Sequence, residues 1–168
     1  NEEGSVYSGN DLSKNGTEEG KQLLELFRSS NGKSSVMGPT RITVKDSFLT
    51  IESVKKVNKM KESSGTDTEL KTENNINRLN SSAKPRNLER VPRDLIFDME
   101  INYKILNIDD KEKVEDMILK SLKLVEIEGI GGAVSRGSGQ VKFIDLKIEN
   151  LFDNSEENMN LDEIKLGE

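Results

Sequence analysis

Apolar and polar residues alternate most regularly over 96–105, IFDMEINYKI, in this chain of 168 residues. The odd positions in that stretch are apolar or aromatic, and the even positions from 98 onward are polar. Because successive side chains of a strand point to opposite faces, the pattern predicts a strand with one buried face. A second stretch, RITVKDSFLTI at 41–51, is rich in β-branched and aromatic residues and predicts another strand. Phe48, Phe97 and Tyr103 are expected in the core.

Two segments have the period of a helix. The first, TEEGKQLLELF at 17–27, has a possible cap and acidic residues in its first turn. The second, DDKEKVEDMILKSLKLVEI at 109–127, predicts an amphipathic helix whose apolar face contains Val114, Met117, Ile118, Leu122 and Val125. Asp109 and Asp110 open this second helix, and this position favours a capping role over a metal site.

The stretch QVKFIDLKIENL at 140–151 predicts a further strand, and its apolar parity shifts after Phe143, which indicates a bulge. Other segments lack a stable period. They predict a polar loop, a linker, a long excursion and a frayed acidic tail, at 1–16, 29–38, 52–75 and from Asp153 onward.

The order of elements predicts an α+β fold that corresponds to the second half of a ferredoxin-like unit. We expect the first strand and helix of that unit to be absent from this chain, which begins with Asn1 and is expected to be processed or part of something larger. The expected organisation is a polar loop at 1–16, a core at 17–150 with an insertion at about 52–75, and an acidic tail at 151–168.

Composition narrows the possible chemistry. Hydrophobic residues make up 32% of the chain and charged residues 33%, so part of the chain is expected to lie outside the core. The absence of cysteine excludes disulfides and thiolate metal sites and favours a reducing, cytoplasmic compartment. The absence of histidine removes the commonest general base. No apolar run approaches the roughly 20 residues of a membrane span, so no membrane contact is expected.

The charge is unevenly distributed. The chain has a net charge of −6, but residues 55–93 contain ten basic and five acidic residues, whereas the remainder contains 15 basic and 26 acidic ones. A basic segment in an acidic chain is compatible with a polyanionic partner and equally with a solvated charged loop.

The stretch IGGAVSRGSGQVKF at 130–143 is unusually rich in glycine. It is not a P-loop, because Ser138 stands where the phosphate-binding lysine is needed and the loop follows a helix instead of opening one. It is not a dinucleotide fingerprint, because Val134 replaces a required glycine. A helix cap and turn would need only one glycine. The surplus predicts contact with a phosphodiester backbone through Gly131, Gly132, Ser135, Arg136, Gly137 and Gly139.

The stretch INRLNSSAKPRNLERVPR at 76–93 combines cations, amides and two prolines. It predicts a semi-rigid arm that binds a nucleic-acid backbone and presses apolar side chains against bases. The candidate RNA-binding residues of this arm and its approach are Asn75, Arg78, Lys84, Pro85, Arg86 and Arg90. The acidic stretch DNSEENMNLDEI begins like a calcium loop but lacks its glycine and its final glutamate, so no calcium site is predicted there.

Four stretches, in the right order, resemble the RAMP-superfamily backbone subunits of type III-A, Csm-type, CRISPR effector complexes. They are ELFRSS, GPTRITVKDSFLT, ENNINRLNSSAKPRNLERV and IGGAVSRGSGQVKF, and the resemblance covers about residues 17–150. The chain departs from the family pattern at Val134, where glycine is frequent, and at Lys84, where asparagine is frequent.

The resemblance implies an RRM-like, ferredoxin-like core with a thumb hairpin, expected within about 52–71. It also implies that the protein polymerises along a crRNA guide and takes part in target RNA binding and cleavage. The implied partners are crRNA, target RNA, copies of itself and the other subunits of the complex.

The family's cleavage of RNA uses a divalent metal, Mg or Mn, and an Asp that lies upstream of the matched stretches. No catalytic residue and no metal ligand is therefore predicted in this chain. Two alternatives remain open, namely an active endoribonuclease and a stand-alone interaction domain whose basic loop is merely solvated.

Overall fold

The computed structural model describes residues 26, 40–106 and 110–166. They belong to two compact units, of which one is Ile42–Tyr103 and the other combines Asn1–Arg41 with Lys104–Glu168. The loop, helix and linker predicted at 1–16, 17–27 and 29–38 lie outside the described residues, except for Leu26, which is helical and buried.

The unit Ile42–Tyr103 contains an antiparallel ribbon that is interrupted once on each side. Strand β1 (Ile42–Val44) pairs with β6 (Ile101–Tyr103), and β2 (Phe48–Leu49) pairs with β5 (Phe97–Asp98). The two strands predicted at 41–51 and 96–105 are therefore confirmed, each in two pieces.

A bulge causes the interruption. Between the pairs Val44–Ile101 and Phe48–Asp98, the three residues 45–47 face only the two residues 99–100. The side chains of Met99, Ile101 and Tyr103 are half-buried, as their alternation predicts.

The prediction that two phenylalanines lie in the core is wrong. The side chains of Phe48 and Phe97 are 70% and 43% exposed. Ile105, at the end of the predicted apolar face, is also exposed. A two-stranded ribbon carries no second layer of its own, so both rings remain partly open to solvent.

Helix α3 (Ile51–Ser64) follows the ribbon, where the sequence predicts an irregular excursion. Thr50 caps it by accepting a hydrogen bond from the amide of Ser53, and Gly65 ends it in the left-handed conformation. The hydroxyl of Ser53, a residue only 1% exposed, accepts a hydrogen bond of 2.7 Å from the amide of Ile96. The apolar pattern does not predict this helix, because the helix contains few apolar residues. It depends instead on its two caps and on the contact of Ser53 with Ile96.

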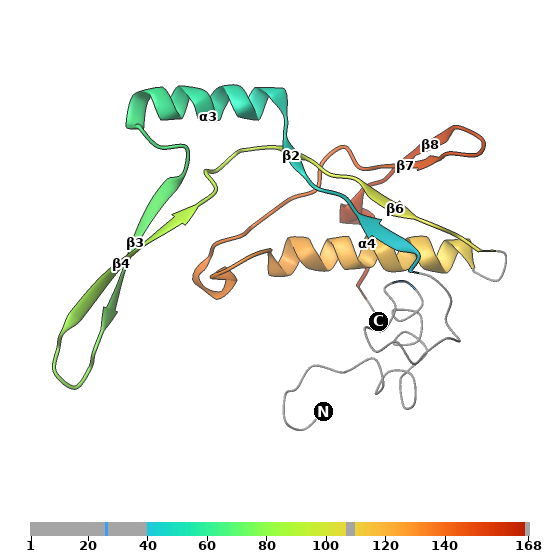
Figure 1. Cartoon of the computed structure of the whole chain (residues 1–168). Coiled ribbons are helices and arrows are strands. Elements are labelled where there is room, and N and C mark those ends of the chain that lie inside the picture. Colours follow the sequence, from blue (N-terminus) through green and yellow to red (C-terminus); the bar gives the residue numbers. More distant parts are fainter. Residues whose placement is uncertain (1–25, 27–39, 107–109, 167–168) are drawn as a thin grey trace. The chain divides into compact units, whose positions relative to one another are not determined.

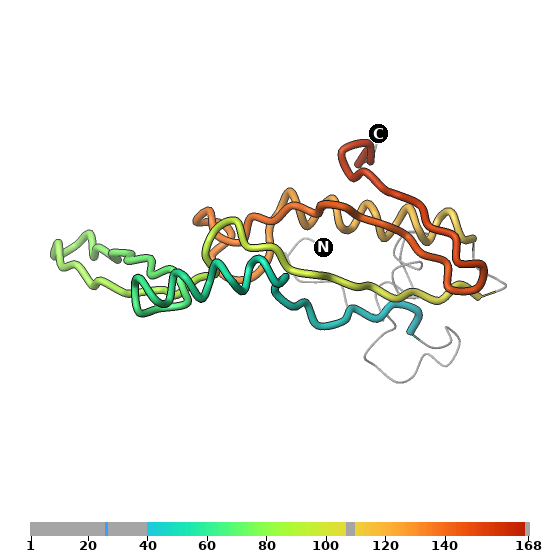
Figure 2. The backbone as a smooth tube through the Cα atoms, turned by 90° about the horizontal axis from the view of Figure 1, so that it is seen from above, coloured from blue at the N-terminus to red at the C-terminus, as the bar shows by residue number. Residues whose placement is uncertain are grey.

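Strands β3 (Glu69–Ile76) and β4 (Ala83–Arg90) form a hairpin in the same unit. The register pairs Glu69 with Arg90 at its base and Ile76 with Ala83 near its tip. In Figures 1 and 2 the hairpin projects away from the rest of its unit. The predicted arm at 76–93 is thus mainly one strand of a hairpin, and the predicted excursion at 52–75 contains a helix and the partner strand.

The second unit is built on helix α4 (Lys111–Glu128). The carboxylate of Asp110 accepts a hydrogen bond from the amide of Lys113, which confirms its capping role, whereas Asp109 lies outside the described residues. Leu119 and Leu122 are the buried side chains of the helix. The sequence pattern predicted Leu122 but not Leu119. No helix in the described ranges is long and apolar enough to cross a membrane.

The chain after α4 turns back along the helix, as Figure 2 shows. It forms a short helical turn η1 (Val134–Arg136), an irregular segment, a hairpin of β7 (Lys147–Asn150) and β8 (Ser155–Asn158), and a turn η2 (Leu161–Glu163). The strand predicted at 140–151 begins only at residue 147. No bulge occurs in it, because residues 140–146 pair with no strand.

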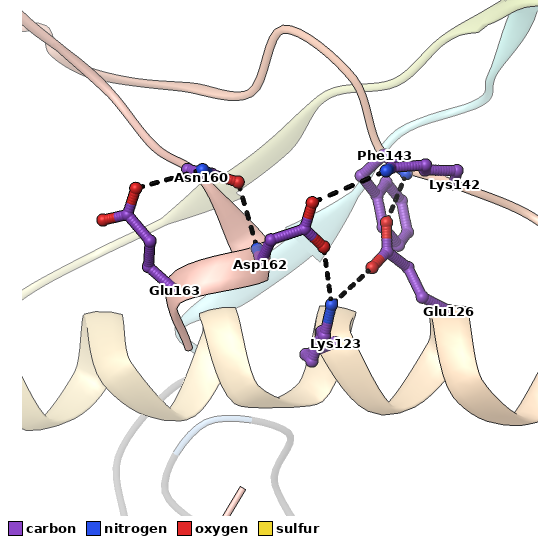
Figure 3. Close-up of polar contacts among 7 residues, drawn as sticks. All are labelled: Lys123, Glu126, Lys142, Phe143, Asn160, Asp162 and Glu163. Atoms are coloured by element: carbon purple, nitrogen blue, oxygen red, sulfur yellow. Dashed lines mark hydrogen bonds and ion pairs between the residues drawn. The ribbon is translucent and has the colours of Figure 1, made fainter. Parts of the chain in front are cut away.

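The described part of the acidic tail, up to residue 166, is ordered, contrary to the prediction that it is frayed. The side chain of Leu161 is 4% exposed. The ammonium of Lys123 donates hydrogen bonds of 3.0 Å to Asp162 and 3.2 Å to Glu126, and Glu126 also accepts one of 2.8 Å from the amide of Phe143 (Figure 3). The hydrogen bond from Lys123, helped by the charge of Lys142, lowers the pKa of Asp162. Two polar side chains of α4 thus hold both returning segments.

Replacing Leu161 by Ala should destabilise the protein by about 2–5 kcal/mol, because the change leaves a cavity where the tail packs. Leu151→Ala is the matched control, since that leucine is 82% exposed and its loss should change stability by less than about 0.5 kcal/mol. Chemical denaturation of both variants measures the difference. Equal stability of the two variants would contradict the docking of the tail.

Candidate nucleic-acid interface

One face of the β3–β4 hairpin is a ladder of charged side chains. The alternation of the strands brings Glu69, Lys71 and Glu73 to the same face as Arg86 and Arg90. Arg90 donates a hydrogen bond of 2.7 Å to Glu69, and Arg86 donates one of 2.9 Å to Glu73. Lys71 lies 3.5 Å from Glu73. Each glutamate of β3 therefore neutralises a cation that the sequence alone offers to an external anion.

The ion pair at the base of the hairpin is reflected in the acid–base properties of its two members. The hydrogen bond from Arg90 lowers the pKa of Glu69, and the same bond raises the pKa of Arg90. Both groups therefore stay charged at neutral pH. Exposed pairs of this kind are worth little in free energy, but they fix the direction of the guanidinium groups.

The tip of the hairpin, residues 77–82, is fixed by two Asx turns. The side-chain oxygen of Asn77 accepts a hydrogen bond of 2.9 Å from the amide of Leu79, and that of Asn80 accepts one of 3.1 Å from the amide of Ser82. The side chain of Leu79 is 98% exposed. The turns therefore hold an apolar side chain in solvent at the end of the hairpin.

Two cations near the tip have no counter-ion among the described residues. Arg78 and Lys84 are exposed, and no acidic group in the described ranges pairs with either of them. Lys84 lies opposite Asn75 in the register, and these two residues line a shallow hollow of about 300 Å³ together with Asn77 and Ser82. The uncompensated positive charge of the hairpin is thus concentrated at its end.

The other face of the hairpin is less polar. Leu70 and Ile76 are 60% and 62% exposed, and Pro85 lies opposite Asn74 on the same face. A proline is tolerated in β4 because a two-stranded hairpin has a free edge on each side. Pro85 therefore belongs to this less polar face and not to the charged one.

The glycine loop, residues 129–139, is closed by its own backbone. The amide of Ile130 donates a hydrogen bond of 2.8 Å to the carbonyl of Gly139. A Cβ atom on Gly139 would lie 1.9 Å from the carbonyl oxygen of Ile130, and one on Gly129 would lie 2.8 Å from that of Gly139. These two glycines are therefore required by the close approach of the two ends of the loop.

Gly132 has no such role. Its φ is not positive, and a Cβ atom built on it would meet no heavy atom within 4 Å. The fold of the loop itself does not demand glycine at this position. A glycine with open space in front of it is what close approach by another molecule requires.

The amides of five consecutive residues, Gly131 to Ser135, donate no hydrogen bond to any group of the described residues. Ala133 is left-handed, with φ 61°, and the right-handed turn η1 follows it directly. This change of hand turns the amides of residues 133, 134 and 135 toward one concavity, a nest that suits an anion. Ser135, whose amide belongs to this nest, is an exposed residue.

At the second change of hand in this loop, the backbone amides already donate hydrogen bonds within the loop. Arg136 and the left-handed Gly137 form another such pair, but the amides of 136 and 138 donate to the carbonyl of Ala133, and the amide of 137 donates to Val134. Only the first nest is therefore open to an external group.

The candidate residues thus form two separate groups. Asn75, Arg78, Lys84, Pro85, Arg86 and Arg90 all lie on the hairpin or its tip, and Gly131, Gly132, Ser135, Arg136, Gly137 and Gly139 all lie in the glycine loop. Sequence reasoning missed Ser82 in the hollow and the amides of Ala133 and Val134. The signal for Ser82 is its place two residues after Asn80, where an Asx turn is expected.

The implied divalent metal finds no fit in this part of the protein. Among the described residues, no group of three or more acidic side chains is arranged to hold a metal ion.

Comparison with known sequences gives a consistent result. The profile of the RAMP superfamily matches residues 7–142. A protein of Methanothermobacter thermautotrophicus named CRISPR system Cms endoribonuclease Csm3 is 44% identical over 140 residues, which cover 76% of this chain and 55% of that protein. Proteins with the same name from Streptococcus thermophilus and Enterococcus italicus are 37% and 33% identical over 134 and 123 residues.

The match to these relatives is partial. It covers 79% of this chain and 58% of the Streptococcus protein, and 73% and 55% in the case of the Enterococcus protein. The chain therefore spans little more than half the length of the relatives it matches.

Gly139→Ala should open the glycine loop, because the added methyl group collides with a backbone carbonyl and the positive φ alone costs about 1–3 kcal/mol. Gly132→Ala should leave the loop and its stability unchanged, since the methyl group points into open space. Backbone chemical shifts of residues 129–139 and thermal unfolding distinguish the two variants. An undisturbed loop in the Gly139 variant would contradict the closure.

Proposed function

This chain belongs to the RAMP superfamily, and on that premise we propose that it is a backbone subunit that binds the guide RNA of a type III CRISPR interference complex. The α+β fold class expected from the sequence is confirmed by that membership. The relatives described above are named as CRISPR endoribonucleases, which supports this assignment and not the stand-alone domain. The observation that carries the proposal is the pairing of uncompensated cations with unused backbone donors in a chain of net charge −6.

The hairpin contributes the first contact. Its base is neutralised by its own glutamates, so a polyanion would meet the positive charge of Arg78 and Lys84 at the tip. The exposed side chain of Leu79 lies between these cations in sequence and offers an apolar surface to a base. The side-chain amides of Asn75 and Asn77, which line the same hollow as Lys84, offer hydrogen-bond donors and acceptors. We therefore assign phosphate contact to the two cations and base contact to Leu79.

The glycine loop contributes the second contact. The nest of amides at residues 133–135 offers three convergent donors, and Ser135 adds a hydroxyl. Gly132 leaves space for a phosphate to approach the backbone closely. Since amides carry no sequence information, such a loop would hold any guide regardless of its bases.

The wider proposal concerns the complete complex. In it, this subunit binds the crRNA guide and takes part in binding and cleaving target RNA, next to copies of itself and to other subunits in the cytoplasm. Cleavage of RNA is supported by the names of the relatives, and Mg or Mn as its metal is part of the proposal. The described residues do not fit such a metal, so we assign this chain's own share to the holding of RNA and derive no cleavage step through it.

Arg78→Ala and Lys84→Ala should each weaken binding of single-stranded RNA and lower the slope of log K against log salt by about 0.7, the loss of one phosphate contact. Arg86→Ala should lower this slope less, because Glu73 already neutralises Arg86. Lys120→Ala is the matched control, since Lys120 pairs with Asp116 on α4, and it should leave the slope unchanged. Fluorescence anisotropy at four or five salt concentrations measures the slope.

Unchanged slopes in both the Arg78 and Lys84 variants would contradict the proposed contact at the hairpin tip. Failure of the unmodified chain to bind RNA even at low salt would contradict the function as a whole.

A further inference from the structure

The hollow near the tip of the β3–β4 hairpin has the chemistry of a site for one RNA base. It is lined by Asn75, Asn77, Ser82 and Lys84, all of them exposed residues. Its volume of about 300 Å³ is at the lower end of the range for pockets that bind small ligands. The hydrogen-bonding groups that the four side chains leave free decide which base fits.

Two of the four residues offer the hollow mainly hydrogen-bond donors. The side-chain oxygen of Asn77 already accepts a hydrogen bond of 2.9 Å from the amide of Leu79, so its two N–H donors are the main groups left for a ligand. The ammonium of Lys84 has three donors and no acceptor, so it can hold a phosphate and still face a base. This part of the hollow therefore favours a base edge that carries acceptors.

The other two residues supply the acceptors. The hydroxyl of Ser82 donates its proton to the side-chain oxygen of Asn80 over 2.8 Å, which leaves its own oxygen as an acceptor. The side chain of Asn75 makes no hydrogen bond within the described ranges, so its carboxamide offers a donor and an acceptor side by side. Asn75 lies directly opposite Lys84 in the register. The hollow thus combines an excess of donors and one positive charge with a smaller number of acceptors.

Guanine matches this set better than the other bases do. Its O6 and N7 atoms are adjacent acceptors, which suit the donors of Asn77 and Lys84. Its N1–H and N2–H₂ groups are adjacent donors, which suit the free oxygens of Asn75 and Ser82. Adenine and cytosine carry an amino group in place of O6, and a donor at that position would face the ammonium of Lys84 without an acceptor. Uracil has an oxygen there but lacks both N7 and the second amino group.

We propose that this hollow selects a guanine base of the bound RNA, with Asn75 and Ser82 as the residues that distinguish guanine from the other bases. The inference rests on the proposed function, because the base must belong to an RNA that the cations of the tip hold by its phosphates. It adds a preference that the glycine loop cannot supply, since phosphate contacts carry no sequence information. The preference biases which nucleotide lies at the tip, and RNA of other sequences still binds.

Short oligouridines that differ only in their central base test this inference on the full chain. The central base is guanine, adenine, cytosine or uracil, so all four RNAs carry the same charge and offer the same phosphate contacts. The unmodified chain should bind the guanine RNA at least about fivefold more tightly than the adenine RNA, because one good pair of hydrogen bonds to a base edge discriminates by that factor or more. Fluorescence anisotropy at one fixed salt concentration measures the four affinities.

Two variants locate the selection in the hollow. Asn75→Ala should reduce the preference for guanine to less than about twofold and leave the affinity for the all-uridine RNA unchanged, because no phosphate contact is lost. Asn74→Ala is the matched control, since Asn74 is equally exposed but lies on the opposite face of β3, across from Pro85. Ser82→Ala should abolish the difference between guanine and hypoxanthine, which lacks the N2 amino group. The amide of Ser82 still donates to Asn80 in this variant, so the tip keeps its turn.

The possible outcomes separate this inference from the proposed function. Equal binding of the four RNAs by the unmodified chain, or tighter binding of another base than guanine, would reject the guanine site and leave the proposed RNA binding intact. A guanine preference that survives in the Asn75 variant would also overturn the assignment to this hollow. Failure to bind any of the four RNAs at low salt would reject the proposed function, and the guanine site with it.

Discussion

Glu69 and Glu73 each hold an arginine across the β3–β4 hairpin, and these two ion pairs decide where the chain can meet a polyanion. Without them the hairpin would be positive along its whole length, and RNA would have no preferred place on it. With them, the base is neutral and oriented, and the charge of Arg78 and Lys84 remains at the tip. The net charge of −6 reinforces this selection, because the acidic residues elsewhere repel nonspecific contact.

The glycine loop follows the same logic with backbone donors in place of side chains. Gly129 and Gly139 allow the two ends of the loop to approach each other. The amides of residues 136–138 donate hydrogen bonds within the loop, whereas those of residues 133–135 donate to none of the described residues. Charged side chains and backbone amides without an acceptor bind a polyanion in complementary ways. The charged side chains attract it over a long range, and the amides give short-range, directional hydrogen bonds.

Local pattern predicted much of this structure from the sequence. The strands around 42–49 and 97–103, the helix capped by Asp110 and the loop after it all depend on residues close in sequence. Helix α3 was missed because its caps and the buried hydroxyl of Ser53 outweigh a weak apolar pattern. The ordered tail was missed because Leu161 and Asp162 find their partners on α4, about forty residues away. The candidate cations were found as residue types, but only the register reveals that Arg86 and Arg90 face glutamates.

The most direct test of the central claim is amide hydrogen exchange of the full chain with and without single-stranded RNA. The amides of residues 131–135 have no acceptor among the described residues, so they should exchange rapidly in the free chain. Bound RNA should slow them, together with those of the hairpin tip at 77–82, and leave the β7–β8 turn unchanged. Protection confined to the acidic hairpin, or none at either predicted site, would contradict the account.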